Sequence, residues 1–540
     1  MANTDFRHLN ALRGTYGNLD ACVNTISTQT GATIEYPLDK DIREFLEKIR
    51  IAETDEEYKI FEYSKDIKEL WGILIKKSLK CLRYFDSREP FQEKANKHPH
   101  ACGVSDLQNY FEKYSEFETT LYGSSKYYRD HVMHVFRVWL IGVNLLLKDG
   151  CKYLKKIAVE SGYDVNAYEK LSIWTLISLT HDLGYPLQKA MEVIERTKSM
   201  MYSFVSNPMV TMDLSFSGVQ SSMNDFVLRF IGSRMWEIDP ESRKTIEYTK
   251  DLFREEQERL SGLVGEDRDN YLKRKRYVAR LQPKYYFKLQ KSLEHSQHGI
   301  LSSLIIYKHL LYFLESDYSL NEDYMFDHED SRQYYIRREI LRAIASHTCH
   351  DIYQNDMLRF SFLLILCDDA QEWGRKSITE LYTKPSNTYT FESIECALDG
   401  KSFECKFKDK YQVNSESVKQ VLDRFKRQSK TYINIFRDGQ DTVSRNFNFT
   451  RQVEIDVIGG NNVNYLLKLM VTTEEQTKIV ITKTDGEPLE KKDIMQQLIS
   501  DIFDKEHLTY IIHSGFISGY QNRYGDNLKP PTNVYHRMTA

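Results

Sequence analysis

Apolar residues recur at helical spacing through most of the chain up to residue 375. Ile42, Phe45, Leu46 and Ile49 fall on one helix face, and a second amphipathic run covers residues 56–84. Residues up to about 36 are mixed and polar, and we assign them no structure. Further runs with long apolar stretches predict buried helices at residues 127–147, 171–180, 293–313, 336–351 and 358–375. This pattern predicts a mainly α-helical protein.

After about residue 385 the pattern changes to alternating apolar and polar residues, which is typical of strands. The expected strand segments are residues 388–408, 431–438, 446–460, 465–473 and 478–488, with one helix at residues 415–428 and turns at Asp399-Gly400, Gly459-Gly460 and Asp485-Gly486. We therefore expect three parts. These are a mostly helical N-terminal region (1–120), a helical core (121–385) with a long insertion at about 187–293, and a smaller C-terminal α+β domain (386–540).

Composition narrows the class of protein. The chain has 540 residues, 41% of them hydrophobic, which is enough for a large core. Its 74 Lys and Arg against 78 Asp and Glu give a net charge of -4, so no strong field selects nucleic acid or an anionic membrane. No apolar run approaches the roughly 20 residues that span a bilayer, so we expect no membrane partner.

Cysteine and aromatic usage complete this picture. The eight cysteines form no C-x-x-C pair, which favours free thiols and a cytoplasmic location over a disulfide framework. The 36 Tyr and 27 Phe exceed ordinary usage, and aromatic residues are enriched at subunit interfaces. We therefore expect a cytoplasmic homo-oligomer.

Metal-binding side chains lie on the apolar faces of the expected helices. His134 falls in the same stripe as Val138 and Ile141, and the apolar run at 171–180 ends in the doublet His181-Asp182. Taken singly, each such residue is more simply a core histidine bonded to backbone or a solvated helix end. The same feature in five helical segments favours one shared metal site, whose candidate ligands are His134, His181, Asp182, His298, His347 and Asp368.

Three neighbouring residues could replace a member of this set, namely His131, His295 and Asp369. Imidazole and carboxylate form the mixed nitrogen and oxygen set that Mn, Fe, Co and Zn accept, and Mg is also a candidate. We expect one or two divalent ions as the cofactor.

The order H…HD…H…H…D resembles the HD-domain superfamily of metal-dependent phosphohydrolases. Local sequence adds to the likeness over about residues 127–375, in the HDLG, AIASH and LCDDAQEWGR segments. The resemblance implies an HD-type helical bundle in which His134, His181, Asp182 and Asp368 bind metal. It also implies that His298 and His347 are the added ligands of a dinuclear site, with Asp182 bridging the two ions. Gly184-Tyr185-Pro186 looks like the hallmark of HD-GYP phosphodiesterases, but there it occupies another place in the domain, so we interpret it as a helix stop.

The function that the resemblance favours is hydrolysis of a nucleotide phosphoester or phosphoanhydride, with a deoxynucleoside triphosphate as the first candidate substrate. Similar large HD proteins also act in bacterial antiviral defence by draining nucleotides, which is a further possibility. Asp182, His350, Asp130 and Arg129, together with Asp351, are candidates for catalysis, proton transfer or ligand orientation. The candidates for holding substrate phosphates are Arg129, Lys189, Arg375 and Arg280.

Two other functions stay open. The six-ligand pattern also suits a phosphodiesterase acting on a cyclic nucleotide or single-stranded nucleic acid, although the near-neutral charge does not favour a nucleic-acid partner. A catalytically silent nucleotide sensor is the third candidate. The basic run at residues 272–291 is interpreted first as a solvated helix face, and alternatively as a phosphate-binding surface for a regulatory nucleotide or nucleic acid.

Overall fold

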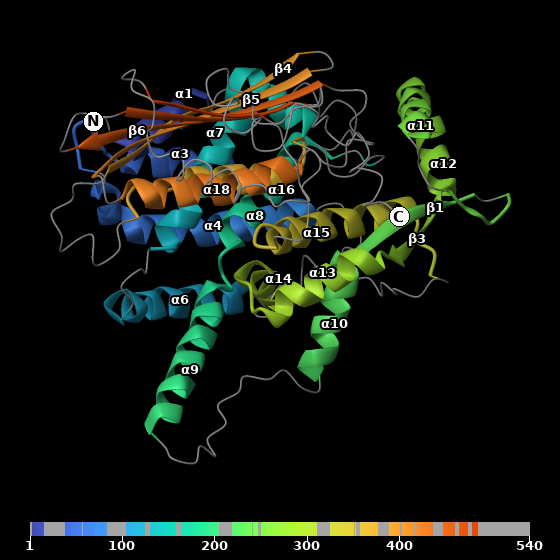
Figure 1. Cartoon of the computed structure of the whole chain (residues 1–540). Coiled ribbons are helices and arrows are strands. Elements are labelled where there is room, and N and C mark those ends of the chain that lie inside the picture. Colours follow the sequence, from blue (N-terminus) through green and yellow to red (C-terminus); the bar gives the residue numbers. More distant parts are fainter. Residues whose placement is uncertain are drawn as a thin grey trace, which may run out of the picture.

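We describe the fold from a computed structural model of the chain (Figure 1). All structural statements concern its described residues, which are 3–15, 38–56, 58–83, 104–124, 130–157, 163, 165–204, 219–239, 241–246, 250–309, 324–349, 352, 357–375, 388–399, 402–414, 417–435, 446–458, 464–472 and 478–483. These residues are mostly helical and include two sheets, which confirms the expectation of a mainly α-helical protein.

Helix α8 (Ala167–Thr180) lies at the centre of the helical core. Every residue from 171 to 184 is buried, as expected for a segment that is apolar on all sides. Its first turn is fixed by a capping box, in which the Asn166 side chain and the Glu169 carboxylate each accept a backbone N–H of the other. A rigid start and a fully buried body mean that the C-terminal end of α8 has a well-defined position.

The other core helices surround α8 (Figure 1). Those that pack directly on it are α4 (Ser64–Arg83), α7 (Val132–Lys156), α15 (His328–Ser346) and α16 (Phe360–Ala370). Helix α14 (His298–His309) packs on α15, and α1 (Thr4–Thr15) and α3 (Leu38–Lys48) add to the outside of α7 and α4. Helix α6 (Val104–Ser124) and the short helix η2 (Lys59–Tyr63) complete this part.

Helix α7 is interrupted near its end, where Asp149, Gly150 and Cys151 have positive φ. The regular part therefore closes at about Leu147, where the predicted helix at 127–147 also ends. Helix α1 was not predicted, because its polar composition carries little helical periodicity of apolar residues.

The long segment after α8 forms helices around a small antiparallel sheet, of strand order β2-β1-β3. Its elements are α9 (Tyr185–Phe204), α10 (Val219–Ile231), β1 (Ser233–Ile238), β2 (Thr245–Ile246), α11 (Lys250–Gly262), α12 (Glu266–Arg274), β3 (Arg276–Leu281) and α13 (Pro283–Glu294). The interpretation of the basic run as one solvated helix face is wrong, since the run is divided among α12, β3 and α13. The buried triplet Tyr277-Val278-Ala279 favours a strand, and Pro283 then begins a new helix.

The C-terminal part is a five-stranded sheet of order β4-β5-β6-β7-β8 with one helix. Its elements are β4 (Thr388–Asp399), β5 (Ser402–Asn414), α18 (Val418–Ile435), β6 (Asn446–Ile458), β7 (Asn464–Thr472) and β8 (Lys478–Lys483). Strands β5 and β6 are parallel and the other neighbours antiparallel, because α18 connects β5 to β6. The expected turn positions Gly400, Gly459-Gly460 and Asp485-Gly486 lie outside the described residues.

One predicted strand in this part is wrong. Residues 431–435 of the expected strand 431–438 belong to α18, and the remainder lies outside the described residues. Val421, Phe425 and Tyr432 are buried at helical spacing, so the apolar stripe of the helix continues through the β-favouring segment.

The helical core and the C-terminal sheet share one continuous set of buried side chains. The ring of His8, on α1, stacks on Trp373 and on Phe391 of β4, with ring centroids 5.1 and 5.2 Å away. The Arg7 Nη2 donates to the Phe391 carbonyl at 2.8 Å. The three-part division of the chain stays a prediction. Among the described helices, none combines the length and the apolar character needed to cross a bilayer.

Candidate metal centre

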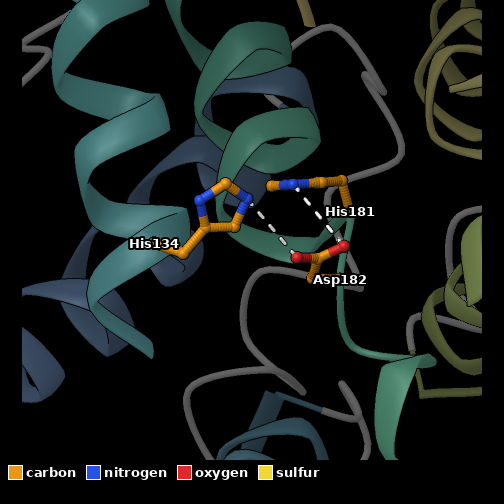
Figure 2. Close-up of side chains that lie close together, drawn as sticks. All are labelled: His134, His181 and Asp182. Atoms are coloured by element: carbon orange, nitrogen blue, oxygen red, sulfur yellow. Dashed lines mark ion pairs between the residues drawn. The ribbon is translucent and has the colours of Figure 1, made fainter. Parts of the chain in front are cut away.

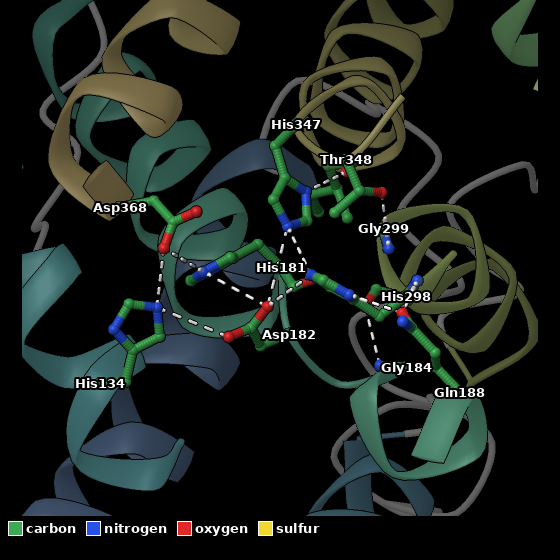
Figure 3. A network of polar contacts seen from close by, with 12 residues as sticks. His134, His181, Asp182, Gly184, Gln188, His298, Gly299, His347, Thr348 and Asp368 are labelled. Atoms are coloured by element: carbon green, nitrogen blue, oxygen red, sulfur yellow. Dashed lines mark hydrogen bonds and ion pairs between the residues drawn. The ribbon is translucent and has the colours of Figure 1, made fainter. Parts of the chain in front are cut away.

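The six candidate ligand side chains point toward one another in the helical core (Figure 3), and Figure 2 shows three of them, His134, His181 and Asp182. They come from the start of α7, the end of α8, the first residue of α14, the residue after α15 and the last turn of α16. Helix ends therefore supply most of the ligands. Because these ends belong to helices that pack on α8 or on α15, their relative positions are set by the core.

One half of the cluster lies between α7 and α16, and we call it the α7–α16 half; it consists of His134, His181 and Asp368. The His134 Nε2 lies 2.9 Å from the Asp368 Oδ1, and 3.5 Å from the Asp182 Oδ2. The His181 Nε2 lies 3.6 Å from the Asp182 Oδ1 and 3.9 Å from the Asp368 Oδ1. His134 thus lies nearest Oδ2 of Asp182, whereas His181 lies nearest Oδ1, and both lie near the Asp368 carboxylate.

The other half lies at the ends of α14 and α15, and we call it the α14–α15 half; it consists of His298 and His347. Their Nε2 atoms lie 3.2 and 3.7 Å from the Asp182 Oδ1, and 3.2 Å from each other. Asp182 therefore contacts His134 through Oδ2, and it contacts these two histidines, as well as His181, through Oδ1 (Figure 3). A carboxylate placed in this way can bridge two metal ions.

Each of the four imidazoles is oriented by a carbonyl oxygen. The Nδ1 atoms of His134 and His298 donate to glutamine oxygens, Gln371 Oε1 at 2.5 Å and Gln188 Oε1 at 2.8 Å. The Nδ1 atoms of His181 and His347 donate to backbone carbonyls of their own helices, at 2.7 and 2.6 Å. A carbonyl oxygen cannot donate, so Nδ1 carries the proton and Nε2 offers its lone pair to the centre.

This arrangement fits a divalent metal. The His181 Nε2 is buried and has no hydrogen-bond partner among the described residues, as expected of a nitrogen that coordinates an ion. Nitrogen and carboxylate oxygen donors within 4.8 Å of one another, each held by an outer hydrogen bond or a helix end, form the donor set that transition metals accept.

The charges of the cluster favour a cation. Burial opposes the ionisation of both carboxylates, but nearby histidines hold the pKa values of Asp182 and Asp368 well below their usual range. Burial also opposes a charged His181, yet these carboxylates raise its pKa to about 9. Burial lowers the pKa of His134 to about 4 and lowers that of His347. Two ionised carboxylates inside a core require compensating positive charge, which protonated His181 supplies in part without metal and which a divalent ion would supply in place of that proton.

The turn after α8 is held against α14. The Ser302 Oγ donates to the His181 carbonyl at 2.6 Å and accepts from the Gly184 N–H at 2.8 Å. A Cβ at Gly184 would lie 2.4 Å from the His298 carbonyl oxygen, so only glycine allows this approach. The interpretation of Gly184-Tyr185-Pro186 as a helix stop is wrong, because α8 already ends at Thr180 and Tyr185 and Pro186 are the first two residues of helix α9.

The end of α16 is held by the C-terminal part. The Tyr389 hydroxyl donates to the Ala370 carbonyl at 2.9 Å, and Arg424 of α18 forms an ion pair with Glu372. Asp369 lies on this side, next to Arg451, and burial raises its pKa to about 6. Asp368 therefore faces the cluster, while its neighbour faces the C-terminal part.

The other two alternative ligands differ in position: His131 lies edge-on to His134, with ring centroids 6.2 Å apart, whereas His295 lies at the surface. His131 is buried and stacks on Tyr185, with ring centroids 3.9 Å apart. His295 is exposed at the end of α13. Among the described residues, neither belongs to a group whose geometry could hold a metal ion.

Of the residues predicted to assist catalysis, Asp130 has a structural contact. Its Oδ1 accepts the Met133 backbone N–H at 2.7 Å, so it caps the start of α7 four residues before His134. The other three, Arg129, His350 and Asp351, lie outside the described residues.

Arg375 is the phosphate-binding candidate with the clearest connection to the cluster. Its positive charge lowers the pKa values of His134 and His131, after burial, so its guanidinium group lies close to both. Its Nη1 is 4.0 Å from a Glu372 oxygen, and its Nε is buried with no hydrogen-bond partner among the described residues. An anion could satisfy this edge of the guanidinium group.

Lys189 and Arg280, the other two described phosphate-binding candidates, differ in their surroundings. Lys189 lies on α9, one residue after Gln188, and forms an ion pair with Glu192 at 2.8 Å. Its Nζ also lies 5.3 Å from the ring centroid of Tyr185. Arg280 is exposed on β3, opposite Arg234 of β1, and none of its described contacts joins it to the cluster.

Sequence analysis missed the two glutamines, Gln188 and Gln371, that orient histidine ligands. Gln371 follows Asp368 by three residues, and this spacing places both side chains on one side of the end of α16. Gln188 follows Asp182 by six residues across a turn, a spacing that carries no such signal.

No family model, no curated protein and no solved structure matches the chain. Membership of the HD-domain superfamily therefore stays a prediction from the residues. The geometry of the cluster, described above, stands independently of it.

Proposed function

We propose that the protein is a metal-dependent phosphohydrolase that acts on a nucleotide. The observation that carries the proposal is the convergence of four Nδ1-anchored histidines and two carboxylates, with Asp182 between two halves of the cluster. A bridging carboxylate flanked by imidazoles suits two ions about 3.5–4 Å apart, which is the usual spacing in two-metal hydrolases.

Divalent ions in such a site supply Lewis acidity and an activated water molecule for attack on phosphorus. The residues of the chain have separate tasks. His134, His181 and Asp368 would hold one ion, His298 and His347 the other, and Asp182 both. The outer carbonyls fix the ring orientations, so that little side-chain reorganisation accompanies binding.

The surroundings support an anionic substrate. The side chains of Asp368 and His298 are 32% and 21% exposed, whereas those of the other four ligands are almost fully buried. A phosphate that approaches from this open side would neutralise the partly unsatisfied guanidinium group of Arg375, and Lys189 could add a second positive charge. The near-balanced charge of the chain favours a small nucleotide over a long polyanion.

A nucleoside triphosphate, above all a deoxynucleoside triphosphate, is the substrate we favour. The second candidate is a phosphodiester of a cyclic nucleotide or of single-stranded nucleic acid. It is supported by the position of Asp182 between the two halves, because two bridged ions also suit in-line displacement at a diester.

A single panel separates these functions. The purified protein is freed of metal, reloaded with Mn²⁺, and incubated with dNTPs, rNTPs, cyclic nucleotides and single-stranded DNA, with products separated by chromatography. Tripolyphosphate and deoxynucleoside would support the first function, and opened cyclic nucleotides or short oligomers the second. Tight retention of one compound without turnover would indicate a sensor. If the protein neither hydrolyses nor retains any compound, the proposal is contradicted.

A further inference from the structure

We infer that Asp5, on the N-terminal helix α1, is a positioning residue for the metal ligand His134, and that it acts through Arg137, Trp373 and Gln371. This inference rests on the proposed metal centre and adds a support that lies outside it. Asp5 lies on a helix that packs on α7, and a continuous series of buried hydrogen bonds joins it to His134.

The first step joins α1 to α7. Asp5 accepts two bonds from Arg137, from Nε at 2.9 Å and from Nη2 at 2.8 Å, in a bidentate pair whose side chains are both fully buried. The Trp373 Nε1 also donates to the Asp5 Oδ1, at 2.9 Å. Asp5 thus orients the guanidinium group of Arg137 and the indole of Trp373 at the same time.

The second step passes through the Trp373 carbonyl oxygen. This oxygen accepts the Arg137 Nη1 at 2.9 Å and the Gln371 Nε2 at 2.9 Å. A carbonyl oxygen has two lone pairs, so both bonds can form together. Because the amide nitrogen of Gln371 is committed to Trp373, its oxygen must face the opposite way.

The third step reaches the metal ligand. The Gln371 Oε1 accepts the Nδ1 proton of His134 at 2.5 Å, which leaves the His134 Nε2 directed at Asp182 and Asp368. Gln371 is fully buried, so no water can replace a lost partner without rearrangement. The orientation of the amide, and with it the tautomer of His134, therefore depends on Arg137 and on Asp5.

The backbone around this series leaves little room for adjustment. Gly374 has φ of 66°, and a Cβ there would lie 2.6 Å from the Arg137 Nη1. If Asp5 is removed, Arg137 becomes a buried charge without its carboxylate and must seek another partner. Its movement would release the Trp373 carbonyl and then Gln371.

The α14–α15 half supplies an internal control, because its glutamine has a separate support. The Gln188 Oε1 accepts both the Nδ1 and the backbone N–H of His298, at 2.8 and 2.9 Å. None of these atoms belongs to the series from Asp5. The inference therefore predicts that Asp5 affects one metal ion and not the other.

The experiment titrates metal-free full-length protein with Co²⁺, followed by calorimetry and by the visible absorption of the ion. We expect Gln371→Leu to weaken one of two Co²⁺ equivalents by about 10- to 100-fold. Asp5→Ala should weaken the same equivalent by roughly 2- to 30-fold. Gln371→Glu, which keeps an acceptor for His134, should restore binding relative to Gln371→Leu.

Two backgrounds assign the affected ion. In a His298→Ala protein, where the α7–α16 half still binds Co²⁺, Asp5→Ala should lower the Co²⁺ affinity. In a His134→Ala protein, where the α14–α15 half still binds Co²⁺, Asp5→Ala should leave the affinity unchanged. Arg7→Ala is the matched control, because Arg7 also lies on α1 but bonds to the Phe391 carbonyl outside the series. It should leave both affinities unchanged. Circular dichroism at the assay temperature checks that each variant is folded.

The inference is overturned if folded Asp5→Ala protein binds both ions like the wild type, or if both equivalents weaken equally. Absence of turnover on every nucleotide would contradict the proposed hydrolase function but would leave these metal affinities measurable. Failure of the wild-type protein to bind any Co²⁺ would overturn both. If Asp5→Ala does not fold, the paired Gln371→Leu and Gln371→Glu proteins test the last step, and equal Co²⁺ binding by the two would overturn it.

Discussion

The two halves of the metal centre are built alike at the ligands and differently behind them. In each half a histidine donates its Nδ1 proton to a glutamine, Gln371 in the α7–α16 half and Gln188 in the α14–α15 half. Behind Gln371 lies a buried series that ends on α1, and the end of α16 is also held by the C-terminal sheet. The Gln188 amide instead bonds within α9, where its Nε2 donates to Glu192 at 3.4 Å.

This difference shows that two halves with similarly anchored histidines can depend unequally on the rest of the chain. The α7–α16 half relies on residues from both ends of the described chain, whereas the α14–α15 half relies on the short path from α8 into α9 and on its packing against α14. Disturbance of a distant segment should therefore affect one ion more than the other.

The largest expected effect comes from the residue that the halves share. Asp182→Ala should remove both ions and lower turnover by roughly 1,000-fold or more, since the loss takes away the bridging ligand and the Lewis acids together. Metal content is measured by atomic emission alongside the rate. Asp267→Ala, at an exposed position on α12, is the control, and an active Asp182→Ala protein with a full complement of metal would contradict the prediction.

A methyl group at Gly184 should damage the α14–α15 half. The new Cβ would meet backbone atoms of α14, including the His298 carbonyl oxygen at 2.4 Å, and backbone cannot rotate away. We expect Gly184→Ala to lower the free energy of unfolding by about 3 kcal/mol and to weaken the ion bound by His298 and His347. Chemical denaturation and Co²⁺ titration measure the two effects. An equal loss of affinity for both ions would contradict the proposed difference between the two halves.

The matching substitution in the α7–α16 half is Gly374→Ala. It places a side chain at positive φ and pushes the Arg137 guanidinium group, so we expect a loss of about 2 kcal/mol in the free energy of unfolding. The affinity for the ion bound by His134 and Asp368 should fall, and the affinity for the ion bound by His298 should stay the same. Loss of affinity for the ion bound by His298, without loss for the ion bound by His134, would contradict the inferred role of the hydrogen-bond series from Asp5.

The smallest effect concerns α1 itself. Burial between two aromatic rings lowers the pKa of His8 from 6.5 to about 4, so the folded protein takes up this proton less readily than the unfolded chain. The contribution of His8 to stability is therefore present above about pH 6.5 and is lost as the pH falls toward 4. His8→Phe should lose less stability than the wild type between pH 7 and 5. Parallel unfolding curves for the two proteins would contradict this cause.

The sequence allowed the main helices to be predicted, because buried helices such as α8 and α16 carry long apolar runs. It also placed His134, His347 and Asp368 on apolar faces, although their role as ligands stays a prediction. Strand β3 and the end of α18 were not predictable in the same way. The charges around β3 favoured a helix, but its pairing with β1 makes it a strand. The β-favouring residues at the end of α18 favoured a strand, but their buried helical stripe makes them part of the helix.

The outer support of the site was beyond sequence analysis for a different reason. Asp5 and Trp373 are 368 residues apart, and no local pattern relates two such positions. Arg137 sits in the middle of an apolar helix, where its burial gives no indication of its partner until the fold is known. Hydrogen-bond series of this kind are properties of tertiary packing, and single-sequence periodicity does not contain them.

The separation of Asp5 from Trp373 also has a consequence for biosynthesis. At about 5–20 residues per second, a ribosome needs roughly 20–70 s to add the 368 residues between them. Arg137 is added 132 residues after Asp5, and for the remaining 236 residues both lack the indole and the carbonyl that complete their set of bonds. The final geometry of the metal centre can form only after most of the chain has left the ribosome, so a nascent, truncated protein would lack the site's full affinity for metal.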